Sequence, residues 1–495
     1  MRLVEILNNV SNVQVKGLPD QIDISKLSID SREADADTLF FAIKGFKVDG
    51  HNFIPEVISK GTKAIVADKN SSLPDDLFRI NECALILVDD TRKSLAEISN
   101  IFYDRPSRRL KLIGITGTKG KTTTAYLIKN ILDNAGFNSG LIGTVENIIG
   151  EEKITSRLTT PESHEINYYL SEMVNKGIEF CVMEVSSHSL ALHRVDYLDF
   201  DFAVFTNLTS DHMDFHESKE HYLKSKKILF DNLRKDAFAV FNADDENCSE
   251  LLKDSKAHLV SYGANGKCDF NISDSTYDFE GSQFVLSSGN KSKKIRTSLI
   301  GEFNIYNAAA AASVGSILGL NQDQITGGIA NLKSIKGRFE VIPGFEKKVI
   351  IDFSHTADSL KEALLAVNEI NNKLSQKKEI ITVFGCGGNR DKTKRPLMGK
   401  YATDLSDYVF ITSDNPRDEE PMSIINDILN GVEKNNYQVL EDREEAIKTA
   451  IINSKQDSII LISGKGHETY QIVKGVKSHF SDRETAEKYL KQCQN

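Results

Sequence analysis

The sequence lacks long apolar runs and paired cysteines. No apolar run approaches the ~18 residues that a membrane-spanning helix needs, so we expect no membrane association. The N-terminal stretch MRLVEILNNV carries Glu5 among its apolar residues and lacks the apolar region of a signal peptide. None of the six cysteines stands in a CxxC pair or a zinc-binding spacing. These absences predict reduced thiols and a cytoplasmic protein.

An excess of positive charge is also lacking. The formal net charge of −10 disfavours a nucleic-acid partner, because phosphate backbones select for basic surfaces. It does not exclude an anionic small molecule, which needs only a few local cations. With 40% hydrophobic and 27% charged residues, the composition is that of an ordinary globular protein.

The length and the pattern of apolar runs predict an α/β protein of three domains. At roughly 150 residues per domain, 495 residues are too many for one core. Short apolar runs alternate with helical stretches, which is typical of mainly parallel sheets. We place the domains at residues 1–92, 93–336 and 337–495. Strands are expected at residues 38–43, 64–67, 110–116, 180–185, 200–205, 349–353, 380–384, 408–412 and 458–462, and a helix is expected to open at the alanine run 308–312.

A glycine-rich loop follows the strand expected at residues 110–116. Gly117 and Gly120 of GTKGKTTT allow a tight turn whose N–H groups point at phosphate oxygens. Lys121 offers a cation to the β- and γ-phosphates, and Thr122 offers a hydroxyl to Mg²⁺. Ile115 stands where the strict GxxxxGK[ST] pattern has its first glycine, but the strand–loop–helix order still predicts an ATP-binding loop.

Potential Mg²⁺ ligands follow the next two expected strands. Glu184 ends the segment CVMEV, where a metal-binding carboxylate beside the phosphate loop is expected. A solvent-exposed glutamate is the alternative. The segment TNLTSDHMDFH (206–216) is dense in metal-capable side chains, among them His212, although a single histidine is more often structural.

The motifs GTKGKTTT, EVSSHSL, TNLTSDHMDFH and GEFNIYN resemble, in their order and spacing, the ATPase core of the Mur ligases. These enzymes build the peptide of bacterial cell-wall precursors. The resemblance implies a small N-terminal α/β domain for a uridine-diphosphate substrate, a central ATP-binding domain with a mostly parallel sheet, and a Rossmann-like C-terminal domain for an amino acid. It implies ATP contacts by Gly117, Thr118, Lys119, Gly120, Lys121, Thr122, Thr123, Asn304, Arg338 and His355.

The same resemblance assigns the remaining residues of the reaction centre. In YLKSKKILF (222–230) it selects Lys226 as a lysine carbamylated by CO₂, whereas the residues alone indicate a solvated basic face. The implied catalytic residues are Lys121, Glu184, His212 and Lys226, and the implied Mg²⁺ ligands are Thr122, Glu184, His212 and carbamylated Lys226. The implied contacts to the uridine-diphosphate substrate are Ser31, Thr159, Thr160, Ser186 and Arg194.

Three stretches of the third expected domain, residues 337–495, resemble the amino-acid site of the family members that add meso-diaminopimelate. They are FGCGGNRDKTKRP, SDNPRDEEP and SGKGHE. Asp414 can accept a substrate ammonium group, and the planar guanidinium of Arg417 suits the distal carboxylate that lysine lacks. A surface ion pair of Arg417 with Glu419 or Glu420 is the alternative. The implied contacts are Arg390, Asp414, Asn415, Pro416, Arg417, Gly464 and Glu468.

The resemblance therefore implies an ATP-dependent ligase. The γ-phosphate of ATP passes to a carboxylate of a UDP-muramoyl dipeptide, and the amine of meso-diaminopimelate attacks the resulting acyl phosphate. We expect small-molecule partners only, and a monomer. Around His355, Phe353, Ser354 and Ala357 replace the more usual Tyr, Ala and Pro. The alternatives are a lysine-adding ligase, a folylpolyglutamate synthase, and a P-loop ATPase switch that acts on a partner protein.

Overall fold

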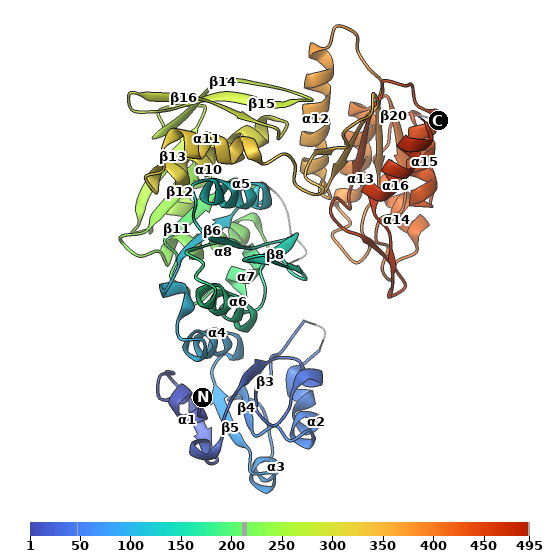
Figure 1. The fold of residues 1–495 in the computed structure, drawn as a ribbon. Helices are drawn as coiled ribbons and strands as arrows, with labels where there is room; N and C mark the ends of the chain where they lie inside the picture. The colour runs from blue at the N-terminus through green and yellow to red at the C-terminus, as the bar shows by residue number, and fades with distance from the viewer. Residues whose placement is uncertain (47, 210–214, 494–495) are drawn as a thin grey trace.

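The computed structural model describes residues 1–46, 48–209 and 215–493, which form three bodies along the chain (Figure 1). The N-terminal body holds a five-stranded sheet in the order β1-β5-β4-β3-β2, parallel except for β1. Its strands are β1 (Gln14–Lys16), β2 (Lys26–Ser28), β3 (Thr38–Phe41), β4 (Ala64–Asp68) and β5 (Ala84–Val88). Its helices are α1 (Leu3–Leu7), α2 (Ile54–Ser59), α3 (Asp75–Ile80) and α4 (Thr91–Phe102).

Helix α4 lies between the N-terminal sheet and the central body (Figure 1). Asp90 caps its N-terminus by accepting from the backbone N–H groups of Arg92 and Lys93. Leu95 and Ile98 are buried in the core of the N-terminal sheet. The predicted boundary between residues 92 and 93 thus falls inside this helix, and it stays a prediction.

The central body holds an eleven-stranded sheet in the order β16-β15-β14-β13-β12-β11-β6-β10-β7-β8-β9. Strand β6 lies in its middle and pairs in parallel with β10 and β11. Both edges end in antiparallel hairpins. The strands are β6 (Lys111–Thr116), β7 (Ser139–Ile142), β8 (Glu146–Ile149), β9 (Glu152–Thr155), β10 (Phe180–Glu184), β11 (Phe202–Phe205), β12 (Phe238–Asn242), β13 (His258–Gly263), β14 (Phe270–Asp278), β15 (Gly281–Ser288) and β16 (Lys291–Thr297).

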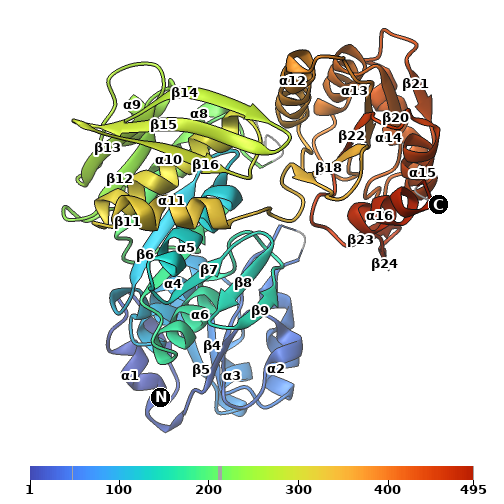
Figure 2. The same ribbon diagram turned by 45° about the horizontal axis from the view of Figure 1, so that its top comes forward.

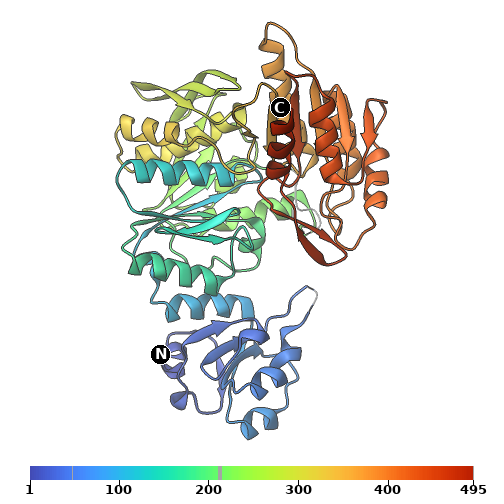
Figure 3. The same ribbon diagram turned by 45° about the vertical axis from the view of Figure 1, so that its right-hand side comes forward.

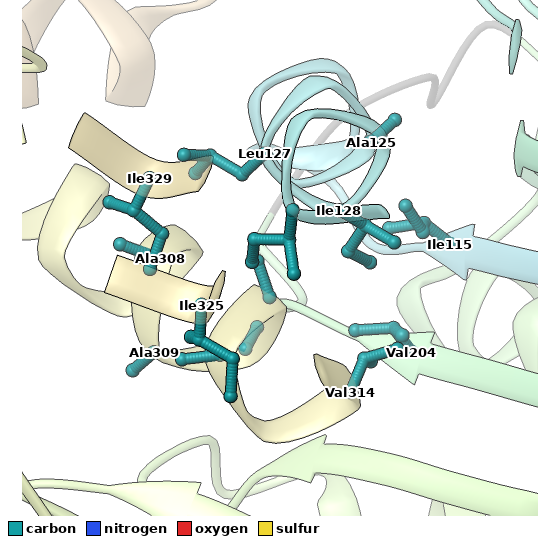
Figure 4. Packing of buried hydrophobic residues seen from close by; sticks show 14 of the residues in the cluster. Ile115, Ala125, Leu127, Ile128, Val204, Ala308, Ala309, Val314, Ile325 and Ile329 are labelled. Carbon is teal, nitrogen blue, oxygen red and sulfur yellow. The ribbon is translucent and has the colours of Figure 1, made fainter. Parts of the chain in front are cut away.

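Helices cover both faces of this sheet. Helices α5, α10 and α11 share one apolar core with β6 and β11, in which Ile128 packs among Ala308, Ala309 and Ile325 (Figure 4). Small residues let the helices approach, since a Cβ at Gly328 of α11 would lie 2.5 Å from the Cα of Ile131. The opposite face carries α6, α7, α8 and α9. The helices are α5 (Lys121–Asn134), α6 (Ser163–Asn175), α7 (Ser187–Ala191), α8 (Lys219–Asp231), α9 (Cys248–Leu252), α10 (Glu302–Ile317) and α11 (Gln322–Asn331).

The third body holds a six-stranded sheet in the order β17-β18-β22-β19-β20-β21, parallel except for β17, and a separate hairpin of β23 and β24. Helix α12 of this body stands beside the ends of β14 and β15, where the Tyr277 hydroxyl donates to Glu369 (Figure 2). The strands are β17 (Glu340–Val341), β18 (Lys348–Asp352), β19 (Ile380–Phe384), β20 (Tyr408–Ile411), β21 (Tyr437–Val439), β22 (Ile459–Ser463), β23 (Tyr470–Val473) and β24 (Val476–His479). The helices are α12 (Ala357–Lys373), α13 (Lys394–Leu405), α14 (Pro421–Leu429), α15 (Arg443–Asn453) and α16 (Asp482–Gln492).

The α/β class and the expected strands are confirmed. Each expected strand of the third body lies within one residue of an observed strand, and the others lie within two. The helix expected to open at the alanine run was placed wrongly. Helix α10 begins six residues earlier, at Glu302, because Gly301 takes a left-handed conformation (φ +102) that starts the helix there. In the described part of the chain, no helix combines the length and apolar character needed to cross a membrane.

The predicted motifs lie at the carboxyl ends of strands that face the space between the central and third bodies. The central and third bodies lie side by side, with the N-terminal body at the far end of the central one (Figure 3). Ligands of open α/β sheets bind beyond the carboxyl ends of the strands. The motifs follow the carboxyl ends of β6, β10 and β11 in the central sheet, and of β18, β19, β20 and β22 in the third sheet. The two sheets therefore present these loops to the space between the bodies.

Candidate active site

A cavity of about 1360 Å³ lies between the central and third bodies. It is large enough for a nucleotide together with a second ligand. Most predicted site residues line it, and they come from both bodies. The predicted residues in its wall are Thr118, Lys119, Gly120, Lys121, Thr122, Thr123, Thr159, Thr160, Glu184, Ser186, Arg194, Asn304, Arg338, His355, Arg390, Asp414, Asn415, Arg417, Gly464 and Glu468.

Four of the predicted residues that the structure describes are not in this wall. Ser31 lies in the N-terminal body, where its carbonyl accepts from Lys60 Nζ at 2.8 Å. Gly117, Pro416 and Lys226 belong to the same two bodies as the cavity but are not among its lining residues. His212 falls outside the described residues. The structure thus gathers the predicted ATP and amino-acid residues, but it does not bring Ser31 to them.

The phosphate loop is held by the segment that follows β11. Gly117 (φ +150) leaves room for Thr206, since a Cβ at Gly117 would meet Thr206 Oγ1 at 1.9 Å. Thr206 Oγ1 donates to the carbonyl of Lys119 at 2.6 Å, and the N–H of Lys119 donates to Asn207 Oδ1 at 3.0 Å. Gly120 (φ +85) is the N-cap of helix α5 and leaves no room for a Cβ, which would lie 2.3 Å from Asn307 Oδ1. The loop is therefore preformed as an anion cradle at a helix N-terminus.

Glu184 ends β10 directly beside the first turn of α5. Its side chain accepts from the Thr122 hydroxyl at 2.9 Å, and from the hydroxyl and N–H of Thr144 at 2.9 and 2.8 Å. Only 1% of the residue is exposed, so the alternative of a solvent-exposed glutamate is wrong. A Cβ at Gly143 would lie 2.5 Å from Glu184 Oε1. The carboxylate is thus fixed against the phosphate loop by close packing and three hydrogen bonds.

The donor atoms at this point suit Mg²⁺, which prefers a few carboxylate and hydroxyl oxygens. Thr122 and Glu184 provide one of each within 2.9 Å of one another. Within residues 1–46, 48–209 and 215–493, no group of three or more His, Cys, Asp or Glu side chains could hold a metal by itself. The ring of His216 contacts the Ser187 hydroxyl at 2.9 Å and is 1% exposed, as expected of a structural histidine. A magnesium site here therefore needs further ligands beyond this pair.

Lys226 is buried beneath the phosphate loop. Its Nζ donates to the Gly117 carbonyl at 2.9 Å and lies 4.4 Å from the centre of the Tyr222 ring. The Tyr222 hydroxyl in turn donates to Thr118 Oγ1 at 3.2 Å. The interpretation of this helix as a solvated basic face is wrong, because Lys226 is 1% and Lys227 is 9% exposed. Lys226 stands where a modified lysine would face the phosphate-binding residues.

Two of the residues predicted to hold the uridine-diphosphate substrate, Thr160 and Ser186, lie directly beside Glu184. Thr160 Oγ1 donates to the Glu184 carbonyl at 2.8 Å and accepts from the N–H of Ser186 at 3.1 Å. Arg194 donates to the Thr160 carbonyl at 3.1 Å and pairs with Glu162 at 2.8 Å. Burial lowers the pKa of Arg194. A cation paired with Glu162 is thus positioned on the wall of the cavity, and Thr160 links it to the backbone carbonyl of Glu184.

The predicted nucleotide residues cluster around Arg338. Its guanidinium donates to Thr122 Oγ1 at 3.2 Å and lies 4.7 Å from the centre of the Phe353 ring. Burial lowers the pKa of Arg338, although Glu184 and Asp352 oppose this effect. The ring of His355 packs on Phe353 with centres 4.6 Å apart. Arg338 therefore links the phosphate loop to the third body.

The loop that carries His355 is ordered without the usual proline. Thr356 caps helix α12 by accepting from the N–H of Ser359, whose side chain accepts from the N–H of Thr356. The Ser354 hydroxyl donates to Asp352. Asn304 in helix α10 donates to the Ile300 carbonyl at 2.8 Å and accepts from Asn307 at 3.1 Å. These contacts fix the polar groups at the nucleotide side of the cavity.

Two arginines form a basic wall at the other end of the cavity. Arg417 Nη1 donates to the Gly388 carbonyl at 2.8 Å. Burial lowers the pKa of Arg417, and the neighbouring Arg390 lowers it further. The alternative surface ion pairs are not formed, because Glu419 pairs with Arg395 and Lys392, and Glu420 pairs with Lys474. Neighbouring guanidinium groups repel each other, so this end of the cavity favours an anionic ligand.

Two carboxylates face this basic wall from the same cavity. Glu468 accepts from Asn415 Nδ2 at 2.8 Å, and burial raises its pKa, which Asp414 raises further. Asp414 pairs with Lys465 Nζ at 3.3 Å, and Lys465 also donates to Asn415 Oδ1 at 3.0 Å. Adjacent acidic and basic groups in one cavity are suited to an amino acid, which carries both charges.

Three family models match the chain in order. The model of the Mur ligase family catalytic domain matches residues 23–103, that of the Mur ligase middle domain residues 115–315, and that of the Mur ligase glutamate ligase domain residues 337–466. A curated relative from Clostridium acetobutylicum, named UDP-N-acetylmuramoyl-L-alanyl-D-glutamate–2,6-diaminopimelate ligase 1, is 40% identical across 99% of this chain and 100% of its own. The chain belongs to the Mur ligase family.

Further Mur ligases support this membership. A relative from Caldanaerobacter subterraneus, named UDP-N-acetylmuramoyl-L-alanyl-D-glutamate–2,6-diaminopimelate ligase, is 42% identical across the full length of both chains. A solved structure of a ligase with that name is 26% identical and superimposes with a TM-score of 0.68, covering 100% of this chain and 99% of its own. The similarity to Mur ligases thus extends over all three bodies.

Sequence reasoning missed several polar residues of this Mur ligase site. Thr144 holds Glu184, and Asn307 accepts from the Thr124 hydroxyl at 3.3 Å beside Gly120. Lys465 and Arg395 are both fully buried next to the amino-acid residues. Lys465 and Arg395 stand inside quoted motifs, and Asn307 ends GEFNIYN, so position within a motif was a usable signal. Thr144 stands in no motif, and only the pairing of β7 with β10 brings it to Glu184.

Proposed function

We propose that this chain is the ATP-dependent ligase that joins meso-diaminopimelate to UDP-N-acetylmuramoyl-L-alanyl-D-glutamate in peptidoglycan precursor synthesis. Membership of the Mur ligase family and the names of full-length relatives support the reaction class. The observation that carries the choice of amino acid is the presence of two arginines and two carboxylates, Arg390, Arg417, Asp414 and Glu468, in the wall of one cavity. We assign the carboxylates to the substrate ammonium and the arginines to its distal carboxylate.

The reaction divides between the two ends of the cavity. At the phosphate loop, the γ-phosphoryl group leaves ADP as its bond to a substrate carboxylate oxygen forms, which brings two anions together. Lys121, whose Nζ donates to the carbonyls of Gly117 and Thr118 at 2.7 and 2.9 Å, supplies a cation there. The amine then forms the C–N bond, loses a proton, and expels phosphate as the C–O bond breaks. Arg194 orients the muramoyl substrate beside Glu184.

Magnesium is the implied metal, and Thr122 and Glu184 are the described residues that would hold it. Carbamylated Lys226 and His212 complete the proposed ligands. When bound, Mg²⁺ supplies positive charge that offsets the repulsion between the phosphate and the substrate carboxylate. Unmodified Lys226 donates a hydrogen bond from Nζ to the Gly117 carbonyl and has no oxygen atom to offer Mg²⁺, so its place in this set depends on the carbamate.

Lysine lacks the carboxylate that would neutralise Arg417. Its binding would leave a half-buried guanidinium with fewer partners than meso-diaminopimelate provides, which disfavours it. The end of the cavity that Arg390, Asp414, Arg417 and Glu468 line has no role in a P-loop switch that only hydrolyses ATP. We further propose three functional domains divided near residues 92 and 336, a uridine-diphosphate site that includes Ser31, a monomeric state and a cytoplasmic location.

An omission assay tests the reaction class. The purified protein is given ATP, Mg²⁺, the UDP-muramoyl dipeptide and meso-diaminopimelate, and phosphate release is measured with each component left out in turn. We expect rapid release only when all components are present. Release that is independent of the dipeptide and the amino acid would indicate an ATPase and overturn the proposal.

A further inference from the structure

Arg395, the second residue of helix α13, is a fully buried arginine next to the amino-acid cavity. Its Nη1 donates to Glu419 Oε2 at 3.0 Å and to Asp427 Oδ2 at 2.8 Å. Its Nη2 donates to Glu419 Oε1 at 3.0 Å and to the Gly387 carbonyl at 3.1 Å. A buried guanidinium is stable only with partners of this kind, and the bidentate pair with Glu419 fixes the planes of both groups.

The pair of Arg395 and Glu419 joins the two loops that form the basic wall. The loop after β19 contains Gly387 to Arg390, and the loop after β20 contains Asp414 to Glu419. Glu419 Oε1 also accepts from the N–H of Asn389 at 2.6 Å. The N–H of Gly388 donates to the Asn415 carbonyl at 2.9 Å. The two loops are thus tied together on the buried side of the wall.

The loop geometry determines where the guanidinium of Arg417 lies. Arg417 has a left-handed backbone (φ +53) and rests its Nη1 on the Gly388 carbonyl. The residues on either side of Gly388 are held by Arg395 and Glu419: Arg395 donates to the Gly387 carbonyl, and Glu419 accepts from the Asn389 N–H. Space is tight here, since a Cβ at Gly387 would lie 2.9 Å from Arg417 Nη1. A small shift of this loop therefore moves the Arg417 guanidinium.

We propose that Arg395 and Glu419 are positioning residues that hold Arg390 and Arg417 as one carboxylate-binding fork and so set the preference for a diamino acid with a distal carboxylate. This inference rests on the proposed function. Neither residue needs to touch the amino acid, because both act through Gly387, Asn389 and the Gly388 carbonyl. Buried residues that fix the orientation of a binding group often determine how precisely that group meets its ligand.

Three variants separate positioning from general stabilisation. Arg395→Lys keeps a cation but loses the fork, and Glu419→Gln keeps the shape but loses the charge. Lys392→Ala is the matched control, because Lys392 contacts the same Glu419 Oε2 at 3.3 Å from the solvent side and is 64% exposed. For each variant we would measure kcat, KM for ATP, KM for meso-diaminopimelate, and the ratio of kcat/KM for meso-diaminopimelate to that for lysine.

We expect Arg395→Lys and Glu419→Gln to raise KM for meso-diaminopimelate about 10-fold and to lower the selectivity ratio about as much. KM for ATP should stay within about 2-fold in both, and Lys392→Ala should match the wild type. If Arg395→Lys fails to fold, Glu419→Gln alone carries the test. Wild-type selectivity and KM in a folded Glu419→Gln would overturn the inference.

Asp427 offers a further check, since Asp427→Asn weakens the other carboxylate contact of Arg395 and leaves the Glu419 bridge intact. We expect this variant to lose thermal stability and to keep the wild-type KM for meso-diaminopimelate. An equal rise of KM in Asp427→Asn would mean a merely structural role and would overturn the inference. A wild-type protein without amino-acid-dependent phosphate release would instead refute the proposed function.

Discussion

Lys119 of the phosphate loop forms an ion pair with Glu362 of helix α12, with 2.8 Å between Nζ and Oε1. The pair joins the central body to the third body at the edge of the shared cavity. The two side chains are 19% and 45% exposed, and a partly solvated pair of this kind contributes up to about 1 kcal/mol.

The first prediction concerns competition for Lys119. If Lys119 contacts the nucleotide phosphates, then Glu362 competes with ATP for the same cation. We expect Glu362→Gln to tighten ATP binding by roughly 2- to 5-fold, the range that such a pair allows. Titration with a fluorescent ATP analogue measures this, and Glu369→Gln on the same helix controls for loss of charge. Weaker ATP binding in Glu362→Gln would show that the pair supports the site instead.

The second prediction concerns Glu184. Glu184→Gln keeps the size of the side chain and can keep its contacts with Thr122 and Thr144, but it removes the negative charge. Because a metal ligand is lost while packing is retained, we expect kcat to fall on the order of 10²-fold or more, with little change in thermal stability. Steady-state kinetics over a range of Mg²⁺ concentrations tests this. If the Glu184→Gln variant turned over as fast as the wild type at low Mg²⁺, Glu184 would be excluded as a metal ligand.

The third prediction concerns the carbamylation of Lys226. Protein equilibrated with ¹³C-bicarbonate should give a carbamate signal in its ¹³C NMR spectrum. Lys226→Arg should abolish this signal and lower the ligase activity on the order of 10²-fold. Lys227→Arg is the matched control, because Lys227 lies next in the chain and pairs with Asp231 and Asp254. Full activity of Lys226→Arg would contradict the carbamate.

The fourth prediction concerns pH. Burial and the neighbouring Asp414 raise the pKa of Glu468, so its carboxylate form is lost at a higher pH than that of an ordinary glutamate. Since the ionised form is the one that binds the substrate ammonium, KM for meso-diaminopimelate should rise as the pH falls through this raised pKa. KM for ATP should change less over the same range.

The variant Glu468→Gln isolates the group responsible. It has no carboxylate to titrate, so we expect a high KM for meso-diaminopimelate that changes less with acidification than in the wild type. Steady-state kinetics between about pH 8 and about pH 5, a range in which ordinary carboxylates stay mostly ionised, supplies the comparison. A wild-type KM that is constant over this range would contradict the assignment of Glu468.

The sequence was most informative where a local pattern determines a local structure. The glycine pattern around Gly117 and Gly120 predicted the strand, loop and helix, because the backbone angles there suit glycine. Glu184 at a strand end was likewise predictable. The burial of Lys226 was not, because three lysines in nine residues are normally a solvated helix face, and only the packing of α8 beneath the phosphate loop buries one of them.

Contacts between distant segments were the part that the sequence could not supply. Arg395 and Asp427 are 32 residues apart and meet only through the packing of α13 on α14. Lys119 and Glu362 belong to different bodies, and no periodicity predicts their pairing. Helix α10 was expected to open at its alanine run, whereas Gly301 sets the observed start at Glu302.

A competition experiment tests the central claim most directly. The wild-type protein is given ATP, Mg²⁺, the UDP-muramoyl dipeptide, and equal concentrations of meso-diaminopimelate and L-lysine, and the products are quantified by mass spectrometry. We predict that the diaminopimelate product exceeds the lysine product at least on the order of 10²-fold, because only the distal carboxylate satisfies Arg417. Equal amounts, or an excess of the lysine product, would contradict the account.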